Sequence, residues 1–411
     1  MRIGYLIPEF PGQTHIIVWR EIQALESMGA SLDLVSTRPV TWNTQQEAWA
    51  AKAIERTLYL AKWHLNDVLA AIVEMMRSGP GGLLRCSRAI RDAEGGSKLR
   101  LLAFALVGAR LSYLARKHRW EWVHVHSCAD SANVALFAFL LSGIPYSIIL
   151  HGPLKDYGQN QKQKWENAAF AFVITRALDT AVKSELAGHL PAHIEISPMG
   201  VNIAVLHRTT PYKAWAGGEI RIFSCGRLNI AKGHLSLIEA IAILRSKGLE
   251  VVLDIAGEDE QGGTGYRREL ERRIAELDLG KAVRLHGVVS EATVAKYLEG
   301  AHAFALASLD EPLGVAIMEA MAMEVPVVMA RSKGVMELVD DGMDGILVEP
   351  GSPEAMARAI ADLLRDRELA LRLSRQGRVK VKEKFQSKGS AEKLLRSIGR
   401  SKNGSIPPCA Q

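Results

Sequence analysis

The chain is poor in cysteine, with four in 411 residues. These four residues are scattered without any paired spacing; they are Cys86, Cys128, Cys225 and Cys409. Proteins held together by disulfides normally carry cysteines at close and regular spacings. We therefore expect a reducing compartment and no disulfide framework.

Two nucleotide-binding signatures and a targeting signal are also absent from the sequence. No Gly-x-Gly-x-x-Gly run follows a strand-like segment and no Gly-Lys-Ser or Gly-Lys-Thr occurs, which disfavours dehydrogenases and P-loop enzymes. The glycine-rich run 79–82 follows no such strand and is interpreted as a linker or turn. The chain opens with a strand pattern at 2–7 in place of a signal peptide, so we expect a cytoplasmic protein.

No uninterrupted apolar run is long enough to span a membrane. The longest apolar stretch, Val134 to Leu150, is broken by Ser142-Gly143-Ile144-Pro145. A bilayer span needs about 20 consecutive apolar residues. The stretch therefore predicts a buried helix of about ten residues, a turn and a strand of about six residues.

Length and pattern predict two α/β domains. A chain of 411 residues exceeds what one core usually organises, and its 48% hydrophobic and 23% charged content is that of a folded protein. Strand-like and helix-like segments alternate along it, as in parallel α/β folds. The predicted strands are 2–7, 31–36, 122–127, 146–150, 170–175, 194–201, 220–225, 250–256, 282–286, 302–307, 325–330 and 345–348. Ser352 followed by Pro353 predicts the start of a helix at 353–365.

The segment 47–119 has a strongly basic balance. It contains 13 Lys and Arg against 6 Asp and Glu, interleaved with many leucines and aromatic residues. Amphipathic helices with basic faces suit an anionic membrane surface, so the segment predicts peripheral membrane contact. The alternative is that these helices only cover the first sheet. Nucleic acid is not expected, because no basic and aromatic recognition module is present.

Two carboxylates, Glu311 and Glu319, lie eight residues apart where a loop becomes a helix. Pro312 favours a stop in the preceding strand, and Gly314 allows close approach of a backbone. The amides that follow form a helix N-terminus suited to a phosphate. Both acids can face one polyhydroxylated ligand, although the spacing also fits two glutamates on a solvated helix.

A basic loop bounded by glycines follows the strand at 220–225. It runs from Gly226 to Gly233 and precedes an amphipathic helix that begins near His234. Arg227 offers a planar fork of donors and Lys232 a mobile ammonium group, so together they can hold two phosphates of a nucleotide diphosphate. The alternative is a surface loop with two ordinary cations.

Taken in order along the chain, these motifs resemble a known family. The sequence resembles the C-terminal half of retaining glycosyltransferases of family 4 (group 1), of the exopolysaccharide or colanic-acid type. The resemblance is close over about 220–365 and rests on Gly226-Arg227 with Lys232-Gly233, Ala256-Gly257, Gly287-Val288, Glu311 to Glu319, and Val325-Pro326-Val327-Val328.

The resemblance implies an α/β fold of the GT-B type, in which two Rossmann-like, doubly wound domains face a central cleft. Residues 1–205 would form the acceptor-side domain, with a helical insertion at about 47–119. Residues 206–385 would bind the nucleotide sugar. The last helix, roughly 369–399, would pack back on the first domain, so that 386–411 would comprise the end of this helix and a disordered tail.

The resemblance also implies roles for individual residues. Arg227 and Lys232 would bind the donor diphosphate, Glu311 the sugar hydroxyls and Glu319 both ribose hydroxyls. Backbone around His286 would meet the base, and amides of the helix start would touch phosphate or sugar. These backbone positions are Gly287, Val288, Gly314 and Val315. In the first domain, His151 resembles a strand-end histidine beside the reacting centre, and Gly12 lies in the first glycine-bearing loop.

The implied activity is that of a hexosyltransferase acting without a metal or other cofactor. It would move a sugar from a UDP- or GDP-linked donor to a hydroxyl acceptor with retention at the anomeric carbon. A lipid-linked glycan in envelope or exopolysaccharide assembly is the first choice of acceptor, which places the protein at the inner face of a membrane. A soluble small-molecule acceptor, a sugar-nucleotide epimerase and a non-catalytic nucleotide-sugar sensor are the alternatives.

Three further residues alternate along the strand predicted at 122–127. His124, His126 and Cys128 fall at every second position and therefore share one face, as metal ligands do. No second cluster supplies the remaining ligands of a closed zinc site, so we expect no metal. His126 is nearest the strand's carboxyl end, where ligands gather in such sheets, and is the stronger candidate for a site residue.

Overall fold

The computed structural model describes residues 1–12, 15–40, 48–95, 97–259 and 265–404. Contacts divide the chain into two compact units. The N-terminal unit comprises Met1–Pro198 and Lys388–Gln411, and the C-terminal unit comprises Met199–Ser387. The sequence placed these divisions at 205–206 and 385–386. The tail beyond 404, with Cys409, and the predicted insertion boundary at Glu47 lie outside the described residues.

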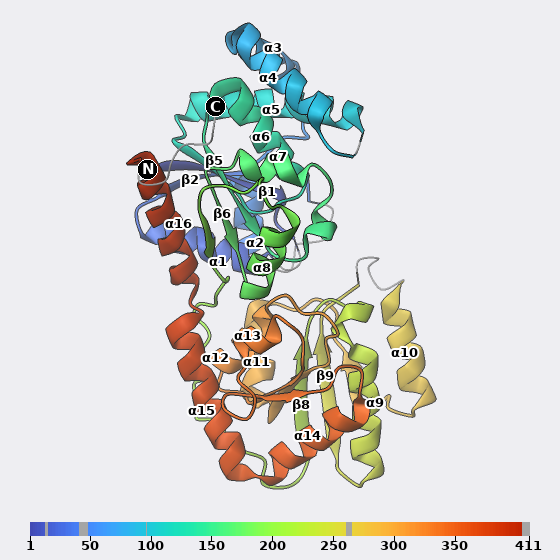
Figure 1. The fold of residues 1–411 in the computed structure, drawn as a ribbon. Helices are drawn as coiled ribbons and strands as arrows, with labels where there is room; N and C mark the ends of the chain where they lie inside the picture. Colours follow the sequence, from blue (N-terminus) through green and yellow to red (C-terminus); the bar gives the residue numbers. More distant parts are fainter. Residues whose placement is uncertain (13–14, 41–47, 96, 260–264, 405–411) are drawn as a thin grey trace. The chain divides into compact units, whose positions relative to one another are not determined.

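The N-terminal unit is built on a parallel sheet with the strand order β3-β2-β1-β4-β5-β6-β7 (Figure 1). Its strands are β1 (Arg2–Glu9), β2 (Ser31–Arg38), β3 (Thr57–Tyr59), β4 (Trp122–Val125), β5 (Tyr146–Leu150), β6 (Phe170–Val173) and β7 (Ile194–Ile196). The strand order reverses between β1 and β4. Ligands in open parallel sheets bind beyond the carboxyl ends of the strands at such a reversal.

Helices cover this sheet and form an outer layer beyond it. They are α1 (Ile16–Ser27), α2 (Ala48–Arg56), α3 (Leu65–Arg77), α4 (Gly79–Asp92), α5 (Lys98–His118), α6 (Asp130–Ser142), the 3₁₀ turn η1 (Leu154–Tyr157), α7 (Gln161–Glu166), α8 (Arg176–Glu185) and α16 (Ser387–Lys402). α6 packs on β1, β4 and β5, α5 packs on α6, and α3 and α4 lie outside them (Figure 1).

The segment 47–119 differs from the prediction in two respects. It contributes β3, an edge strand, in addition to helices. The run 79–82, which we interpreted as a linker or turn, forms the first turn of α4. Gly82 avoids a clash there, because a Cβ would lie 2.6 Å from Cβ of Ser78. Pro80 fits the first turn of a helix, where an amide donor is not required.

The C-terminal unit has a parallel sheet with the order β10-β9-β8-β11-β12-β13. Its strands are β8 (Ile220–Cys225), β9 (Val251–Ala256), β10 (Val283–Leu285), β11 (Ala303–Leu306), β12 (Val327–Ala330) and β13 (Ile346–Val348). Its helices are the 3₁₀ turn η2 (Ile230–Lys232), α9 (His234–Ser246), α10 (Tyr266–Glu276), α11 (Glu291–Gly300), α12 (Val315–Ala322), α13 (Val335–Leu338), α14 (Pro353–Arg365) and α15 (Arg367–Lys384). Here the order reverses between β8 and β11.

The predicted helix at 353–365 is confirmed as α14. Oγ of Ser352 accepts a hydrogen bond from the backbone N–H of Ala355 at 3.2 Å, and Pro353 occupies the first turn. Ile360 and Leu363 of α14 are fully buried in the core that α9 and the sheet share. The cap therefore fixes the start of a helix that closes the hydrophobic core.

The single final helix predicted at about 369–399 is wrong. The structure has two helices, α15 and α16, which are interrupted at Phe385 and Gln386. Val201 donates its backbone N–H to the carbonyl of Phe385 at 2.9 Å and accepts from the N–H of Ser387 at 3.1 Å. A Cβ at Gly200 would lie 2.3 Å from the backbone of Gln386. This strand-like pairing takes the backbone groups that would continue the helix.

The apolar stretch 134–150 forms the predicted helix, turn and strand, as α6 and β5. Ten of the thirteen residues of α6 are buried, so the whole circumference of this helix is enclosed by protein. Among the described helices, none combines the length and apolar character needed to cross a membrane.

Candidate functional site

Two loops meet at the strand-order reversal of the C-terminal unit. The loop after β8 contains η2, and the loop after β11 leads to α12. Leu309 donates its backbone N–H to the carbonyl of Ala231 at 2.8 Å, which fastens one loop to the other. Gly233 has φ +65°, and a Cβ there would lie 1.9 Å from the carbonyl oxygen of Ala307. Only glycine allows this close approach.

Lys232 and Glu311 form an ion pair across these loops. Nζ of Lys232 donates to Oε2 of Glu311, and Oγ of Ser308 lies 3.4 Å from the same oxygen. The side chain of Lys232 is 18% exposed and that of Glu311 is 7% exposed. Oδ1 of Asn229 accepts from the backbone N–H of Lys232 at 3.2 Å and so fixes the turn that carries the lysine.

Glu319 lies in the same region, near the carboxyl end of β8. It is 8% exposed on α12. Burial and then the negative charge of Glu319 raise the pKa of the Cys225 thiol to about 12, while the positive charge of Lys232 opposes this rise. Cys225 therefore lies within electrostatic reach of both groups. Lys232 was predicted from one motif and Glu311 and Glu319 from another, and the structure brings the two motifs together near the end of β8.

The side chain of Arg227 is exposed on the loop after β8. Its backbone carbonyl accepts from the N–H of Asn229 at 3.0 Å and lies 3.3 Å from Nε2 of His234. His234 is fully buried, and burial lowers its pKa to about 4. A neutral imidazole beneath the loop therefore fixes the backbone of Arg227 while its guanidinium remains accessible to solvent.

The loop after β10 carries the predicted base-binding positions Gly287 and Val288. Gly257 donates its backbone N–H to the carbonyl of Gly287 at 2.8 Å. A Cβ at Gly257 would lie 1.9 Å from the carbonyl oxygen of Gly226. The chain segments after β8, β9 and β10 thus lie side by side at one edge of the sheet. Gly287 and Val288 are both partly exposed there.

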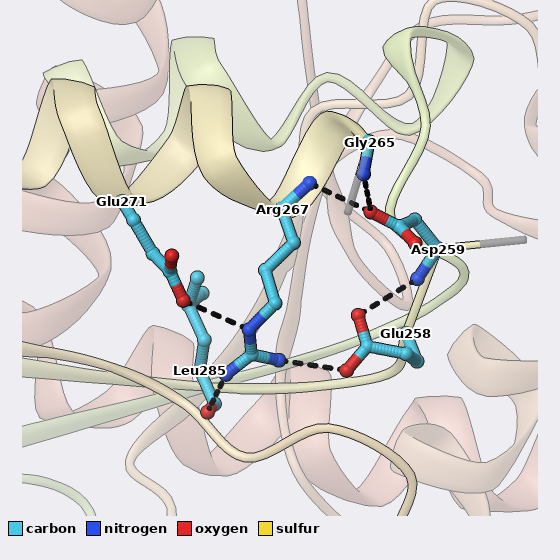
Figure 2. A network of polar contacts seen from close by, with 6 residues as sticks. All are labelled: Glu258, Asp259, Gly265, Arg267, Glu271 and Leu285. Carbon is cyan, nitrogen blue, oxygen red and sulfur yellow. Dashed lines mark hydrogen bonds and ion pairs between the residues drawn. The ribbon is translucent and has the colours of Figure 1, made fainter. Parts of the chain in front are cut away.

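A polar network that the sequence analysis missed is centred on Arg267, in the first turn of α10 (Figure 2). Figure 2 shows the guanidinium of Arg267 directed at Glu258, Glu271 and the carbonyl of Leu285. The distances are 2.8 Å from Nη1 to Glu258 Oε2, 2.9 Å from Nε to Glu271 Oε1, and 2.8 Å from Nη2 to Leu285 O. A Cβ at Gly287 would lie 3.4 Å from Oε2 of Glu258.

A second carboxylate completes this network at the start of α10. Oδ2 of Asp259 accepts from the backbone N–H groups of Gly265 and Arg267, at 3.1 and 3.0 Å. These are orphan donors of a helix N-terminus, so Asp259 caps α10 and orients Arg267. The charge pattern of α10, with Arg267 and Glu271 four residues apart, was the available sequence signal.

The predicted positions Gly314 and Val315 form the start of α12. Gly314 has φ +88°, and Val315 is the first residue of the helix. A Cβ at Gly334 would lie 2.0 Å from the carbonyl oxygen of Pro312, so a second loop packs closely behind this turn. The N-terminus of α12 thus lies at the reversal point together with Glu311, and its dipole favours an anion.

The two candidates in the N-terminal unit lie in the loops after β1 and β5. The carbonyl of Gly12 accepts a hydrogen bond from the backbone N–H of His15 at 3.0 Å. A Cβ at Gly12 would lie 2.9 Å from the His15 ring. His151 directly follows β5. Its Nε2 lies 3.1 Å from Nδ1 of His126.

The three residues considered as metal ligands have separate partners. Nδ1 of His124 lies 2.9 Å from Oγ of Ser147, His126 contacts His151, and Sγ of Cys128 lies 3.4 Å from the carbonyl of Ile149. Across the described part of the chain, no group of three or more His, Cys, Asp and Glu side chains is placed to hold a metal ion.

Glu21 and Tyr5 are further polar residues of this region that the sequence analysis missed. The hydroxyl of Tyr5 donates to Oε2 of Glu21, and Nε2 of His126 lies 3.5 Å from the same oxygen. The spacing of Val18, Glu21 and Leu25 puts Glu21 on the buried stripe of α1. A carboxylate at such a position was the available signal.

Comparison with known proteins finds similarity that is concentrated in the C-terminal unit. A family model described as "Glycosyl transferases group 1" matches residues 211–380. The lipopolysaccharide core biosynthesis glycosyltransferase LpsE of Rhizobium meliloti is 31% identical over 177 residues, which are 43% of this chain and 49% of LpsE. WcaL of Salmonella typhimurium, whose name assigns it to colanic acid biosynthesis, is 24% identical over 412 residues, covering 96% of this chain and 98% of WcaL.

The fold is shared with solved structures over nearly the whole chain. HepE of Anabaena, solved in complex with UDP and glucose, has a TM-score of 0.73 at 18% identity, and the alignment covers 97% of this chain and 99% of HepE. This likeness confirms the expected fold class of two doubly wound α/β units of the GT-B type. The match of LpsE spans about half of that relative's length, whereas the match of WcaL spans nearly all of it. The sequence of residues 211–380 is therefore similar to the glycosyl transferases group 1 family, and the solved structures show the same fold over nearly the whole chain.

Proposed function

We propose that the chain transfers a glycosyl group from a nucleotide diphosphate sugar to a hydroxyl acceptor, with retention at the anomeric carbon. The observation that carries the proposal is the Lys232–Glu311 ion pair at the strand-order reversal, with Glu319 buried beside it. A cation, two acids and a helix N-terminus at one sheet edge match the anionic and hydroxyl groups of such a donor. The complex of HepE with UDP and glucose supports this class of donor.

In this proposal the C-terminal unit stabilises the departing diphosphate. Arg227, Lys232 and the start of α12 supply positive charge where negative charge grows as the sugar bond breaks. Glu311 accepts hydrogen bonds from sugar hydroxyls, Glu319 accepts from the ribose, and the backbone at Gly287 and Val288 meets the base. The leaving phosphate takes the proton of the acceptor hydroxyl on the same face.

The N-terminal unit has two proposed roles in the same reaction. His151 orients the reacting sugar, and the loop at Gly12 leaves room for backbone approach. Both roles rest on the resemblance of the sequence to the family. Neither role depends on the ion pair in the C-terminal unit.

A panel of UDP- and GDP-linked sugars tests the proposal. Thermal stabilisation by one donor, followed by mass analysis of products with membrane extracts as acceptor source, is expected to show transfer of the sugar. A free epimerised nucleotide sugar as the product would replace the transferase assignment by an epimerase. Absence of stabilisation by every nucleoside diphosphate and sugar nucleotide would contradict the donor site.

We further propose that the acceptor is lipid-linked and that α3 contacts the membrane. Five large apolar side chains follow one face of α3 and are exposed to solvent, with Leu65 at 76% and Met76 at 66% exposure; the others are Leu69, Ile72 and Val73. The polar Glu74 is directed inward and pairs with Arg116 at 2.7 Å. In an ordinary surface helix the apolar side chains face inward and the polar ones face solvent, and α3 shows the reverse.

The surroundings of this face add positive charge. Exposed basic residues on α3, α4 and α5 include Arg77, Arg85, Arg88, Arg91, Lys98 and Arg100. An apolar helix face with neighbouring cations favours an anionic bilayer, where each cation near the surface adds about 1 kcal/mol. The biosynthetic names of LpsE and WcaL support an envelope polysaccharide as the product class.

Vesicle flotation tests the membrane contact. We expect the protein to float with vesicles containing phosphatidylglycerol, and a variant with L69E and M76E to remain in the dense fraction. Met343→Glu, at a 63% exposed methionine of the C-terminal unit, is the matched control and is expected to float. Equal flotation of all three proteins, or of none, would refute a role of α3 and leave the donor site unaffected.

Incorporation of labelled sugar tests the acceptor. Label in the organic-solvent extract of membranes supports a lipid-linked acceptor, whereas label confined to water-soluble products assigns a small-molecule acceptor.

A further inference from the structure

The loop after β10 is fastened through two consecutive residues. The carbonyl of Leu285, the last residue of β10, accepts from Nη2 of Arg267 at 2.8 Å. The ring of His286 follows, and it lies between two partners: Nε2 is 2.6 Å from Oδ1 of Asp254, and Nδ1 is 3.1 Å from the hydroxyl of Tyr297. The chain is therefore held in place directly before the residues proposed to meet the base.

The next peptide groups include one that is unpaired within the protein. The carbonyl of Gly287 accepts from the N–H of Gly257 at 2.8 Å. In the part of the chain that the structure describes, neither the backbone N–H nor the carbonyl of Val288 forms a hydrogen bond, and Val288 is partly exposed. Such a peptide can pair with the polar edge of a base only if the loop holds its direction.

Arg267 also connects this loop to the segment after β9. Its Nη1 donates to Oε2 of Glu258 at 2.8 Å (Figure 2). The backbone carbonyl of Glu258 accepts from the N–H of Leu228, in the loop after β8, at 3.1 Å. The segment after β9 therefore lies against the proposed diphosphate loop, and Arg267 ties the proposed base loop to that segment.

The guanidinium of Arg267 is suited to this task. Its third nitrogen, Nε, donates to Glu271 of its own helix at 2.9 Å, and the side chain is 20% exposed. The three nitrogens thus contact α10, the segment after β9 and the end of β10. A planar guanidinium fixes the directions of all three contacts, which the single ammonium group of a lysine does not. Arg267 therefore acts through the loop.

We propose that Arg267 is a positioning residue for the nucleobase of the donor. By joining Glu258 to the carbonyl of Leu285, it holds the loop after β10 where the backbone of Val288 meets the base. We call these two contacts the Arg267 clamp. The contact with a base rests on the proposed function, whereas the clamp itself does not.

The clamp should affect the base and spare the diphosphate. The loop after β8 has a separate fastening, because the N–H of Leu309 donates to the carbonyl of Ala231. A base loop that is already ordered binds without a further entropic cost. It also discriminates between bases, because a base with the wrong edge leaves polar groups unpaired. A loosened loop should lose both advantages.

Hydrogen exchange of the full-length protein without ligand, followed by mass spectrometry, tests the clamp. The backbone N–H groups of Gly257 and His286 form hydrogen bonds that link the chain around β9 to the loop after β10. In Arg267→Met they are expected to exchange about tenfold faster than in the wild type. Arg272→Met is the matched control, because Arg272 is a 65% exposed cation of the same helix, and it should exchange as the wild type does. Unchanged exchange in R267M would overturn the clamp.

A double variant separates the clamp from general loss of stability. Arg267→Met leaves the carboxylate of Glu258, which is 16% exposed, without this cation. Adding Glu258→Gln removes that charge and keeps the shape, so the double variant should melt closer to the wild type and still exchange faster. Wild-type exchange in the folded double variant would refute the clamp even where the single variant fails to fold.

Calorimetric titration with UDP, GDP and inorganic pyrophosphate tests the role toward the base. The wild type should prefer one nucleotide. In R267M its affinity should fall by about tenfold and the UDP-to-GDP affinity ratio should approach one, because the loop is no longer ordered in advance. Affinity for pyrophosphate should stay unchanged, as should all three affinities in R272M.

Three results would overturn the role toward the base. They are equal wild-type affinities for UDP and GDP, an unchanged ratio in R267M, and an equal loss for all three ligands, which a merely structural residue would cause. Binding of no nucleotide by the wild type would contradict the proposed function. Hydrogen exchange would then still decide the clamp, so the two failures are distinguishable.

Discussion

At the residue scale, the ion pair between Lys232 and Glu311 changes what a substitution at the lysine should do. From the sequence alone, Lys232 is an exposed residue whose removal leaves folding intact. In the structure it neutralises a carboxylate that is 7% exposed. Loss of one partner of a buried pair leaves the other charge uncompensated, and this costs free energy of unfolding as well as activity.

Lys232→Ala is therefore expected to lower turnover by about 10²- to 10³-fold and the free energy of unfolding by about 1–3 kcal/mol. The double variant with Glu311→Gln should regain stability, since the orphan charge is gone, but not activity. Steady-state kinetics and thermal unfolding measure both effects. Normal turnover of K232A would show that the phosphates bind elsewhere.

Glu319→Gln tests the proposed ribose contact. The substitution keeps the shape of a buried side chain and removes its charge, so affinity for UDP or GDP should fall by roughly 1–3 kcal/mol. Calorimetric titration of the nucleotide measures the change. Glu354→Gln, at an exposed position in the first turn of α14, is the control and should bind as the wild type does.

Buried histidines predict a loss of stability in mild acid. Burial lowers the pKa of His124 to about 3 and of His234 to about 4, from an ordinary value of 6.5. The unfolded chain takes up these protons below pH 6.5 and the folded chain does not, so stability falls as pH falls from 6.5 toward these values. Each histidine contributes about 1.4 kcal/mol per pH unit in this window.

Calorimetric melting between pH 7.5 and 5.0 measures this dependence. The melting temperature should fall most steeply below pH 6.5. His234→Gln should melt lower at pH 7.5 but lose less on acidification, because one of the proton uptakes is removed. An identical pH slope in the variant would assign the acid sensitivity to other groups.

At the scale of elements, the strands were the most predictable part of the molecule. The apolar runs at 146–150 and 220–225 form β5 and β8 with the predicted bounds, because parallel strands are buried on both faces. The break between α15 and α16 could not be predicted, since it depends on pairing with Val201 far away in the sequence. β3 was missed for a similar reason: it is three residues long and is defined by pairing with β2.

The candidate site was predictable only in part. Lys232 and Glu311 belong to motifs with a fixed order along the chain, and the structure joins them. Glu21 was missed because a lone acid in a helix is normally assigned to the solvated face, and its partners come from other strands. Polar networks built across elements leave little trace in local patterns of hydrophobicity.

The loop after β8 depends on Gly233, and its substitution is an element-scale prediction. Gly233→Ala requires a left-handed backbone at φ +65° and places a methyl group against the carbonyl of Ala307. We expect the C-terminal unit to lose roughly 2–4 kcal/mol and nucleotide binding to weaken. Gly248 also has a positive φ, +82°, but a Cβ there would meet no atom within 4 Å. Gly248→Ala should therefore cost only the free energy of a left-handed backbone at alanine. Equal melting temperatures for the two variants would contradict this account.

At the scale of the whole molecule, the chain crosses between its units twice. The C-terminal unit is one continuous segment, whereas the N-terminal unit also needs α16. α16 is tied to it by Lys393, which donates to the carbonyl of Ile196 at 2.6 Å, and by Arg396, which pairs with Glu195 at 2.7 Å.

Truncation after residue 387 should therefore act on one unit only. We expect the melting transition of the N-terminal unit to fall or vanish, while the transition of the C-terminal unit and its stabilisation by UDP remain. Differential scanning calorimetry with and without UDP resolves the two. Parallel loss of both transitions would show that the units do not fold independently.

The Lys232–Glu311 contact also implies that these two side chains neutralise each other until a donor binds. A nucleotide diphosphate without its sugar would pair with the ammonium group of Lys232. The buried carboxylate of Glu311 would then have no cation beside it. An intact donor brings phosphate for one partner and alcohol groups for the other, so each gains a replacement at the same moment. Product should therefore leave readily and fresh donor should outcompete it, because the ion pair between Lys232 and Glu311 re-forms when the product dissociates.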